Sequence, residues 1–371
     1  MRVLHITSGN MYGGVETFLA TLARESAAAP EMESEFAVCF EGRCSQELAL
    51  LGHVPHLLGH VRLSRPHTLL RARRGLAALL RRTRYDVVVC HQPWTYVVFG
   101  SVARRAERPV ALWVHMAGEG RHWLERLARR MRPDVAICNS QFSASQLSRW
   151  LTDAHVEQVY YPVSTPASSV AERQRPATRQ AVDTPESDIV IVQVSRLEPW
   201  KGQHVLLQAL TELRALNGWT CWIIGGAQRP AEVAYRQQLE AIARDGGIED
   251  RVRFLGQRAD VPALLAAADL FCQPNTAPEP FGLSLVEGLQ AGLPVVTSGV
   301  GGACEIVDAS CGVLTPPGDS TALADALERL VIDRELRARL GAAARRRPAV
   351  LCDASRQMRR IHQVLSSVAA A

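Results

Sequence analysis

Lysine is almost absent from this chain of 371 residues. Of its 42 basic residues, 41 are arginine, and Lys201 is the single lysine. An arginine-rich codon composition accounts for most of this bias, so the one lysine that remains stands out. It ends the run Ser195-Arg196-Leu197-Glu198-Pro199-Trp200-Lys201, at an expected junction between a strand and a helix. Because the planar guanidinium of arginine does not replace a compact ammonium everywhere, Lys201 is a candidate functional residue.

The chain also lacks the sequence features of a secreted, membrane-spanning or metal-binding protein. Nine cysteines include no Cys-x-x-Cys pair and mostly lie in apolar surroundings, as is typical of reduced thiols in a cytoplasmic protein. No secretory signal is visible, and no apolar run approaches the ~18–20 residues of a spanning helix. Metal-ligand spacing is missing, and so is an Asp-x-Asp pair for Mg²⁺. We therefore expect a cytoplasmic protein with no metal and no cofactor.

Short apolar runs alternate with amphipathic segments along most of the chain. Apolar runs of four to six residues separated by helices are typical of parallel strands covered on both faces. Residues 164–187 are rich in Ser, Pro, Ala, Gln and Arg and predict a surface linker. The pattern therefore predicts an α/β fold with two Rossmann-like, doubly wound domains. The expected parts are a domain at 1–165, a linker at 166–187, a domain at 188–350 and a C-terminal helix at 351–371 that crosses back to the first domain.

The expected motifs fall where strands end, which is where ligands bind in such sheets. Strands are expected at 3–7, 36–40, 86–90, 110–115, 135–138, 189–195, 220–224, 252–255, 270–273, 294–297 and 312–314. Helices are expected at 15–28, 68–84, 202–216, 232–245, 261–267, from 282, 321–332, 335–346 and 353–366. A further helix follows Asn139-Ser140, where Ser143 is the expected N-cap because Gln146 lies three residues on.

Two groups of charged residues have the chemistry of a phosphate and sugar site. Arg196 and Lys201 flank a turn, and a helix that begins near Gly202 offers free N–H groups and the positive end of its dipole, so together they suit a diphosphate. Glu279 and Glu287 are eight residues apart, a little over two helical turns, and ionised carboxylates accept hydrogen bonds from vicinal hydroxyls. Paired carboxylates also occur in glycoside hydrolases, but the nearby cations favour a nucleotide-sugar.

The segment Glu279-Pro280-Phe281-Gly282-Leu283-Ser284-Leu285-Val286-Glu287-Gly288, followed by Gly301-Gly302, resembles the signature of retaining glycosyltransferases of family 4. The segment from Arg196 to Gly202 is similar to the same family. The resemblance implies the B-type glycosyltransferase fold, in which two Rossmann-like domains face each other across an interdomain cleft. It also implies that the second domain binds the donor and the first the acceptor.

The resemblance implies a role for each matching residue. Arg196 and Lys201 would neutralise the donor diphosphate, Glu279 and His115 would contact the transferred sugar, and Glu287 would hold the ribose. These roles make Arg196, Lys201, Glu279 and His115 the expected catalytic residues. The expected donor-binding residues are Gly13, Gly14, Arg196, Lys201, Glu279, Phe281, Gly282, Leu283 and Glu287.

Some positions depart from the family pattern or match it without a defined role. Ser195 stands where the family usually has Gly, and Gly288 where it usually has Ala. His91, which ends a strand, and Asn139-Ser140, which follow another, match family positions that can line the site. Glu16 continues the Gly13-Gly14 motif.

The expected function is transfer of a sugar from a UDP- or GDP-sugar to a hydroxyl acceptor, with retention and without a metal. The acceptor would belong to cell-surface polysaccharide or glycoconjugate synthesis. A nucleotide-sugar epimerase on the same fold and a non-catalytic sugar-nucleotide sensor are the alternatives. We expect Lys201→Ala to reduce transfer far more than stability, because an exposed cation contributes little to folding.

Residues 61–132 carry 16 arginines against four acidic residues. A helix packed on the sheet with a solvated basic face would explain this charge. Docking on an anionic membrane surface that carries a lipid-linked acceptor would explain it too. Nucleic acid is not expected as a partner, because neither a binding fold nor interleaved aromatic residues support it. We therefore expect a cytoplasmic location, with peripheral contact to the inner face of the membrane as an option.

Overall fold

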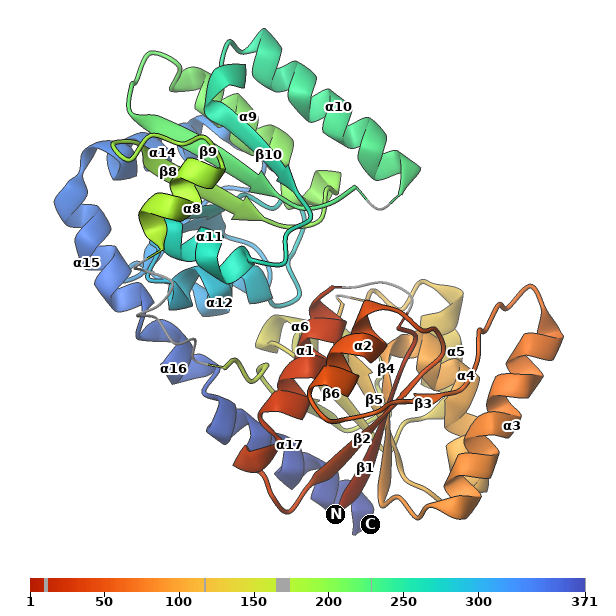
Figure 1. Ribbon diagram of the computed structural model, residues 1–371. Helices are drawn as coiled ribbons and strands as arrows, with labels where there is room; N and C mark the ends of the chain where they lie inside the picture. The colour runs from red at the N-terminus through yellow and green to blue at the C-terminus, as the bar shows by residue number, and fades with distance from the viewer. Residues whose placement is uncertain (10–12, 117, 165–173, 228, 371) are drawn as a thin grey trace. The chain divides into compact units, whose positions relative to one another are not determined.

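The computed structural model describes residues 1–9, 13–116, 118–164, 174–227 and 229–370. They belong to two compact units (Figure 1). The first unit consists of Met1–Ser164 and Cys352–Ala371, and the second of Thr165–Leu351. Each unit contains one parallel β-sheet with helices packed against it, so the predicted pair of Rossmann-like α/β domains is confirmed.

The sheet of the first unit has seven parallel strands in the order β3-β2-β1-β4-β5-β6-β7. Its strands are β1 (Arg2–Thr7), β2 (Glu33–Val38), β3 (His56–Leu57), β4 (Val87–His91), β5 (Val110–Val114), β6 (Val135–Cys138) and β7 (Val156–Gln158). Because β1 pairs with both β2 and β4, the strand order reverses between β1 and β4. Such a switch point leaves a crevice at the carboxyl ends of the strands, where ligands bind in this class of sheet.

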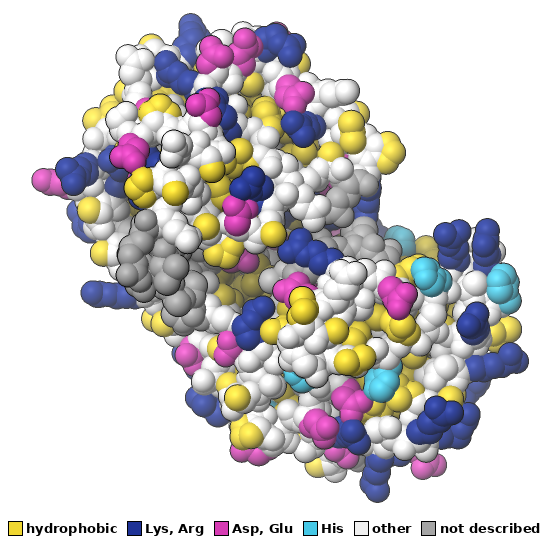
Figure 2. Space-filling model, in the orientation of Figure 1, with side chains coloured by type: hydrophobic (Ala, Val, Ile, Leu, Met, Phe, Trp, Pro, Cys, Tyr) yellow, Lys and Arg dark blue, Asp and Glu magenta, His cyan; other side chains and the backbone are white. Residues whose placement is uncertain are grey.

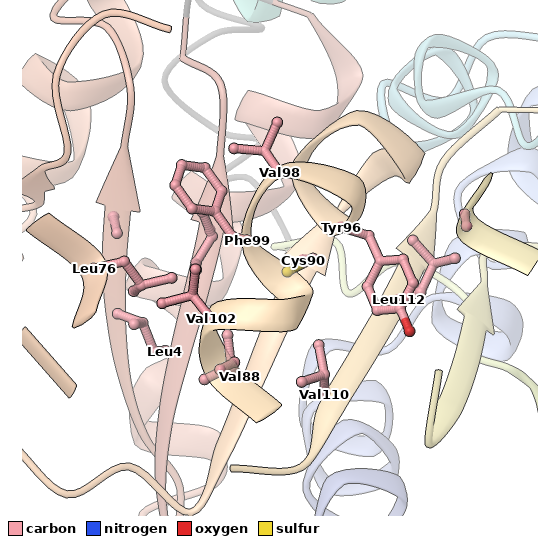
Figure 3. Close-up of a cluster of buried hydrophobic side chains, with 14 of the residues drawn as sticks. Leu4, Leu76, Val88, Cys90, Tyr96, Val98, Phe99, Val102, Val110 and Leu112 are labelled. Atoms are coloured by element: carbon pink, nitrogen blue, oxygen red, sulfur yellow. The ribbon is translucent and has the colours of Figure 1, made fainter. Parts of the chain in front are cut away.

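Amphipathic helices cover this sheet, and their buried faces form the core with it. They are α1 (Gly14–Arg24), α2 (Arg43–Leu50), α3 (Pro66–Arg82), α4 (Gln92–Arg105), α5 (Trp123–Met131) and α6 (Gln141–Trp150), with a 3₁₀ turn at Ser26–Ala28. Figure 3 shows Phe99 and Val102 of α4 close to Leu4 of β1 and Val88 of β4, all fully or almost fully buried. Leu76 of α3 joins the same cluster, so this arginine-rich helix packs an apolar side chain into the core.

The sheet of the second unit has six parallel strands in the order β10-β9-β8-β11-β12-β13. They are β8 (Ile189–Val194), β9 (Trp219–Ile224), β10 (Val252–Gly256), β11 (Leu270–Gln273), β12 (Val295–Ser298) and β13 (Gly312–Thr315). Here the order reverses between β8 and β11. The segments that follow these two strands contain Arg196, Lys201 and Glu279.

The helices of the second unit complete its layers. They are α8 (Arg175–Ala181), α9 (Gln203–Glu212), α10 (Pro230–Asp245), α11 (Val261–Ala267), α12 (Leu283–Gln290), α13 (Ala303–Ile306), α14 (Ser320–Ile332), α15 (Arg334–Ala344) and α16 (Arg347–Leu351). Two 3₁₀ turns, Pro199–Lys201 and Glu249–Arg251, precede α9 and β10. The core of the unit is formed by buried side chains of the strands together with α9, α10 and α14.

The expected linker at 166–187 differs from the structure over its described part. Residues 175–181 form α8, which packs beside α11 within the second unit (Figure 1). Arg179 is 1% exposed, and its guanidinium donates to Asp269 Oδ2 at 2.6 Å and to the carbonyl of Ala267 at 3.0 Å. The composition suggested a linker because hydrogen-bonded arginines, rather than large apolar side chains, attach this helix. The rest of the expected linker, 165–173, lies outside the described residues.

The chain ends in α17 (Ala354–Ala369), which belongs to the first unit. Its buried face includes Met358, Ile361 and Leu365. The helix packs against the 3₁₀ turn after α1 and against β4, and both chain termini lie in this unit (Figure 1). Asp353 caps the helix by accepting from the backbone N–H of Arg356 at 2.7 Å.

One predicted cap was wrong. Ser140, not Ser143, is the N-cap of α6, and its hydroxyl accepts from the backbone N–H of Ser143 at 2.9 Å. The helix therefore begins at Gln141, directly after the cap Ser140. Serine is a strong N-cap at either position, so the local pattern alone does not separate the two.

Candidate functional site

The lone lysine and the first glutamate of the signature form an ion pair. Lys201 Nζ donates to Glu279 Oε2 at 2.6 Å. The side chain of Lys201 is 12% exposed and that of Glu279 is 9% exposed. The ammonium also lies 4.0 Å from the centre of the Trp200 ring, within cation–π distance. Two residues that are 78 positions apart in the sequence thus meet at the carboxyl edge of the second sheet.

Two amide side chains complete the surroundings of Glu279. Asn275 Nδ2 donates to Glu279 Oε2 at 2.8 Å, and Gln273 Nε2 donates to the same oxygen at 3.2 Å. Gln273 is held in turn by Ser284, whose hydroxyl donates to Gln273 Oε1 at 2.9 Å. Three donors therefore converge on one carboxylate oxygen. Within the described residues the other oxygen of Glu279, Oε1, has no hydrogen-bond partner, so it can accept from a ligand hydroxyl.

Arg196 lies in the same loop but has a different partner. Its Nη1 is 2.9 Å from Glu198 Oε1, and its side chain is 37% exposed. Trp200 Nε1 donates to Glu198 Oε2 at 2.9 Å, so Glu198 orients both residues. A half-exposed guanidinium held by a neighbouring carboxylate can bind an arriving anion with its remaining N–H groups.

The turn between Lys201 and α9 requires glycine. Gly202 has a φ of +72°, and a Cβ at this position would lie 1.8 Å from the carbonyl oxygen of Pro274. This contact brings the start of α9 against the segment that follows β11. Gln203 fixes the turn from the other side, because its Nε2 donates to the carbonyl of Arg196 at 2.8 Å. The helix N-terminus therefore starts directly beside the ion pair of Lys201.

The signature segment adopts the expected turn into a helix. Gly282 is the N-cap of α12, with a φ of +104°, and Leu283 is the first residue of the helix. Gly301 and Gly302 pack against this turn. A Cβ on Gly301 would lie 2.5 Å from the carbonyl oxygen of Glu279, and one on Gly302 would lie 2.6 Å from that of Pro280. The second glycine pair of the motif thus sets the position of the Glu279 backbone.

Glu287 lies on α12, five residues after the N-cap Gly282. Desolvation of this side chain by burial raises the pKa of its carboxyl from 4.5 to about 7. Within the described residues its carboxylate has no hydrogen-bond partner. An acidic group that is desolvated and has no partner is a frequent feature of functional sites.

The two departures from the family pattern have local explanations. Gly288 faces the ring of Phe271, and a Cβ on residue 288 would lie 2.7 Å from Phe271 Cγ. Glycine is therefore required here by packing. The hydroxyl of Ser195 accepts from Gln203 Nε2 at 2.9 Å, which adds a link between the end of β8 and α9.

His115, in the first unit, has both ring nitrogens engaged. Nε2 lies 2.8 Å from His91 Nδ1, and Nδ1 hydrogen-bonds the hydroxyl of Tyr161. Asn139 Nδ2 donates to the same hydroxyl at 3.0 Å. The predicted residues His91, His115 and Asn139 therefore belong to one buried network at the carboxyl ends of β4, β5 and β6.

The Gly13-Gly14 pair begins α1. The backbone N–H of Gly13 donates to Glu16 Oε2 at 3.0 Å, which gives Glu16 a capping role. A Cβ on Gly13 would meet only this carboxylate oxygen, at 3.8 Å, so packing within the described residues does not require glycine here. The preceding residues 10–12 lie outside the described part of the chain.

Sequence patterns did not single out several residues that hold this site. They are Gln193, Glu198, Gln203, Gln273 and Asn275. Gln193 Nε2 donates to the carbonyl of Lys201 at 2.8 Å and belongs to buried β8. Polar side chains in or directly after buried strands were the available signal, because such groups need partners. The expectation that Lys201 is an exposed cation was wrong. Its side chain is 12% exposed, because the folded chain brings Glu279 next to it.

The described residues contain neither a candidate metal site nor a helix that could span a membrane. Among these residues the His, Cys, Asp and Glu side chains form no group of three that could hold a metal ion. Every described helix is too short or too polar to cross a lipid bilayer.

Comparison with known proteins gives the class of this chain. Residues 174–347 match the family described as glycosyl transferases group 1, and residues 12–165 match glycosyltransferase family 4. The phosphatidyl-myo-inositol mannosyltransferase of Mycobacterium leprae is 31% identical over 266 residues, which are 70% of this chain and 67% of that protein. The chain therefore belongs to the group 1/family 4 glycosyltransferases.

Two further proteins are similar to this chain. The D-inositol 3-phosphate glycosyltransferase of Salinispora tropica is 37% identical over 49% of this chain and 39% of its own length. The crystal structure of HepE from Anabaena, in complex with UDP and glucose, matches with a TM-score of 0.84 and 25% identity over 99% of this chain and 100% of that one. The match to the Salinispora protein thus spans less than half of that protein.

Proposed function

We propose that this protein transfers a sugar from a UDP- or GDP-sugar to a hydroxyl acceptor, with retention at the anomeric carbon, in polysaccharide or glycoconjugate synthesis. The observation that carries the proposal is the pair of Lys201 and Glu279, held by Gln273 and Asn275 beside the helix starts of α9 and α12. An ammonium and a carboxylate in contact offer one group for phosphate and one for sugar hydroxyls.

The diphosphate would bind to Arg196, Lys201 and the first N–H groups of α9 and α12. A helix N-terminus favours an anion through its free N–H groups and its dipole. As the bond to the sugar breaks, negative charge grows on the leaving phosphate, and fixed cations placed there stabilise the transition state. Glu279 would accept from hydroxyls of the transferred sugar through Oε1, and Glu287 from the ribose.

Transfer would proceed by attack on the face from which the diphosphate leaves. The bond between the anomeric carbon and the phosphate oxygen breaks, and the acceptor oxygen forms the new bond on the same side. The proton of the acceptor hydroxyl passes to the leaving phosphate oxygen. This scheme needs no enzymatic nucleophile and no metal. On the first unit, His115 and the Gly13-Gly14 loop would contact sugar substrate.

Names of related proteins support the choice of donors. HepE was crystallised with UDP and glucose, and a relative from Mycobacterium tuberculosis, 36% identical over 165 residues, is named as GDP-mannose-dependent. The donor base and sugar are therefore best found by measurement. A thermal-shift screen of nucleotide-sugars identifies the donor, because a tight ligand stabilises by RT ln(1 + [L]/Kd).

Incubation of the labelled donor with and without acceptor extracts then tests the function. We expect a labelled glycan that forms only with acceptor, with the anomeric configuration of the donor as read by NMR. Conversion of the donor without acceptor would show an epimerase, and binding without conversion would show a sensor. Inversion at the anomeric carbon would contradict the retaining mechanism.

Chelation tests the proposed metal-independent mechanism. With Arg196, Lys201 and helix N-termini to meet the charge of the leaving diphosphate, EDTA is expected to leave the transfer rate unchanged. A sharp loss on chelation that Mg²⁺ or Mn²⁺ restores would overturn it.

We also propose that the arginine-rich surface of the first unit docks on anionic lipid. On α5, Trp123 is 49% exposed and Leu127 is 37% exposed, and Arg126 and Arg130 flank them on the same face. Beside this helix a cavity of about 420 Å³ is lined by Gly120, Arg126, Arg129, Arg130, Arg132, Trp150 and Asp153. Basic side chains also gather over α3 (Figure 2). Exposed apolar residues between arginines are typical of helices that lie on membranes.

Sedimentation with vesicles tests this surface. The wild-type protein is expected to bind vesicles that contain anionic lipid, and less so at high salt, because surface charge is screened. Arg126→Glu with Arg130→Glu should abolish binding. The matched control, Arg334→Glu with Arg339→Glu on exposed positions of α15, changes net charge equally and should bind nearly as wild type. Equal loss in both variants would contradict a specific surface.

A further inference from the structure

Three buried histidines of the first unit form a continuous chain of hydrogen bonds. His5 Nδ1 lies 3.0 Å from His91 Nε2, and His91 Nδ1 lies 2.8 Å from His115 Nε2. His115 Nδ1 then hydrogen-bonds the hydroxyl of Tyr161. All four side chains are at most 8% exposed. The chain runs from the middle of β1, through the end of β4, to the residue that follows β5.

The three imidazoles are neutral. Burial lowers the pKa of His5 to about 3 and, together with His5, lowers that of His115 to about 3. The pKa of His91 is lowered well below its usual value by burial and by its two histidine neighbours. Among the described residues, the His115 ring hydrogen-bonds His91 and Tyr161, and the backbone carbonyl of His115 accepts from Asn139; none of these partners is charged. Each ring therefore carries one N–H and offers one acceptor nitrogen.

The two ends of this hydrogen-bond chain indicate which nitrogen of each ring carries the proton. At one end, His5 Nε2 is buried and has no partner within the described residues. Buried N–H groups without an acceptor are rarer than unsatisfied acceptors, so Nε2 of His5 is the unprotonated nitrogen. His5 Nδ1–H then donates to His91, His91 Nδ1–H donates to His115, and His115 Nδ1–H donates to Tyr161. All three rings carry their proton on Nδ1.

We propose that His5 and His91 are positioning residues that hold His115 as a single neutral tautomer, with its Nδ1–H edge next to the Tyr161 hydroxyl. The proposal rests on the proposed function, which places a substrate sugar at this carboxyl edge of the first sheet. At this position the His115 ring and the Tyr161 hydroxyl keep the same protonation state. The arrangement of N–H and O–H groups at this edge does not change with pH, because no ring becomes charged.

Aromatic packing fixes the three histidine rings in addition to their hydrogen bonds. His5 stacks on Phe36 with ring centres 5.6 Å apart, and Phe18 contacts His91, His115 and Tyr161. Trp113 lies parallel to His115 at 5.8 Å between ring centres. Rotation of one ring would therefore break both its stacking and its hydrogen bonds. This coupling allows His5, in the interior of β1, to affect His115.

Nitrogen NMR on protein labelled with ¹⁵N in histidine tests the tautomers directly. We expect three of the 11 histidines to show protonated Nδ1 and unprotonated Nε2 at all values between pH 5.5 and 9, with couplings across two N–H···N bonds. A protonated Nε2 at His5, or titration of His5, His91 or His115 in this pH range, would overturn the proposal.

Kinetics of four variants then test the positioning role. His91→Leu and His5→Phe break the chain, and we expect kcat to fall by about tenfold to a hundredfold, as misplaced groups commonly cost. His91→Gln, which keeps one donor and one acceptor, should recover most of the rate. Phe36→Leu removes packing next to His5 but no hydrogen bond, and it should keep the wild-type rate. Nucleoside diphosphate binding at the second unit should be unchanged in all four.

The outcomes separate this inference from the proposed function. Wild-type rates in His91→Leu and His5→Phe would overturn the positioning role while the transferase assignment stands. The absence of transfer by the wild-type protein with every donor would overturn the proposed function, and the positioning role with it. Equal losses in His91→Leu and His91→Gln, with Phe36→Leu reduced as well, would show a structural role only and would also overturn the proposal.

Discussion

At the scale of single residues, Lys201 has a structural role in the fold and a proposed role in the reaction. Its ammonium neutralises Glu279 within the fold, and the proposed reaction requires it to neutralise the donor diphosphate as well. An ion pair at this depth is sensitive to the loss of one partner, because the remaining charge is left desolvated. The residue that the arginine-rich composition singled out is therefore part of the fold as well as of the site.

Lys201→Ala is expected to destabilise the protein as well as to abolish transfer. Loss of the cation leaves Glu279 with only the two amides, and removal of one partner from such a pair costs about 3 kcal/mol. Chemical denaturation measures this change. Arg236→Ala, which breaks the exposed pair of Arg236 and Glu240, is the control and should cost less than about 0.5 kcal/mol. Equal stability of the two variants would contradict the buried pair.

The raised pKa of Glu287 predicts that donor binding depends on pH. Its pKa is raised to about 7, so the carboxyl is mostly protonated at pH 6 and mostly ionised at pH 8. If the ionised form holds the ribose, a nucleotide-sugar should bind roughly tenfold more tightly at pH 8. Calorimetry measures this affinity, and a nucleotide-sugar is the right probe because its esterified diphosphate does not titrate there. Glu287→Gln should remove the pH dependence, and a wild-type affinity that falls with pH would contradict the assignment.

The same carboxyl gives the opposite sign for stability. Because its pKa is higher in the folded state than its ordinary value of 4.5, the folded state binds more protons between about pH 4.5 and 7. Its contribution to stability is therefore complete below pH 4.5 and is lost as the pH rises through 7. Donor binding and folding thus have opposite preferences for the protonation of Glu287.

At the scale of elements, α12 and β11 are shaped to fit one another at Gly288. The helix approaches the strand so closely that Phe271 occupies the volume of a possible side chain. This close approach fixes the backbone of α12 next to Glu287, the neighbour of Gly288. The glycine in place of the usual alanine is therefore matched by a large residue on the strand.

Gly288→Ala is expected to destabilise the protein by about 1 kcal/mol. Overpacking typically costs 1–3 kcal/mol, and the better helix propensity of alanine offsets up to about 1 kcal/mol. In a Phe271→Leu background the same change should become neutral or stabilising, because the clash with the ring is gone. A double-mutant cycle by denaturant unfolding measures the coupling. Additive effects of the two changes would contradict the contact.

Sequence patterns predicted the elements well where the signal is local. Buried strands such as β1, β4 and β8 consist mostly of apolar residues, and the glycine at 282 marks the start of α12. The short edge strands β3 and β7 have two and three residues and give no such signal. Helix α8 was missed because Arg179 and Asp269, rather than apolar side chains, hold it. The network around Glu279 could not be predicted, since Gln273, Asn275 and Lys201 meet only in the folded chain.

At the scale of the whole molecule, the chain consists of two units built on the same plan. In each sheet the strand order reverses once, and the candidate residues lie at the carboxyl ends of the strands beside that point. The first unit places the histidine chain there, and the second places the ion pair and the two helix starts. The C-terminal helix α17 returns to the first unit, so that unit contains both ends of the chain.

The most direct test of the account is a crystal structure of the protein with its nucleotide-sugar. The account predicts the diphosphate within hydrogen-bonding distance of Arg196 and Lys201, the ribose hydroxyls on Glu287 and the sugar hydroxyls on Glu279. A nucleotide-sugar bound elsewhere, with the pair of Lys201 and Glu279 unchanged and remote from its diphosphate, would contradict it.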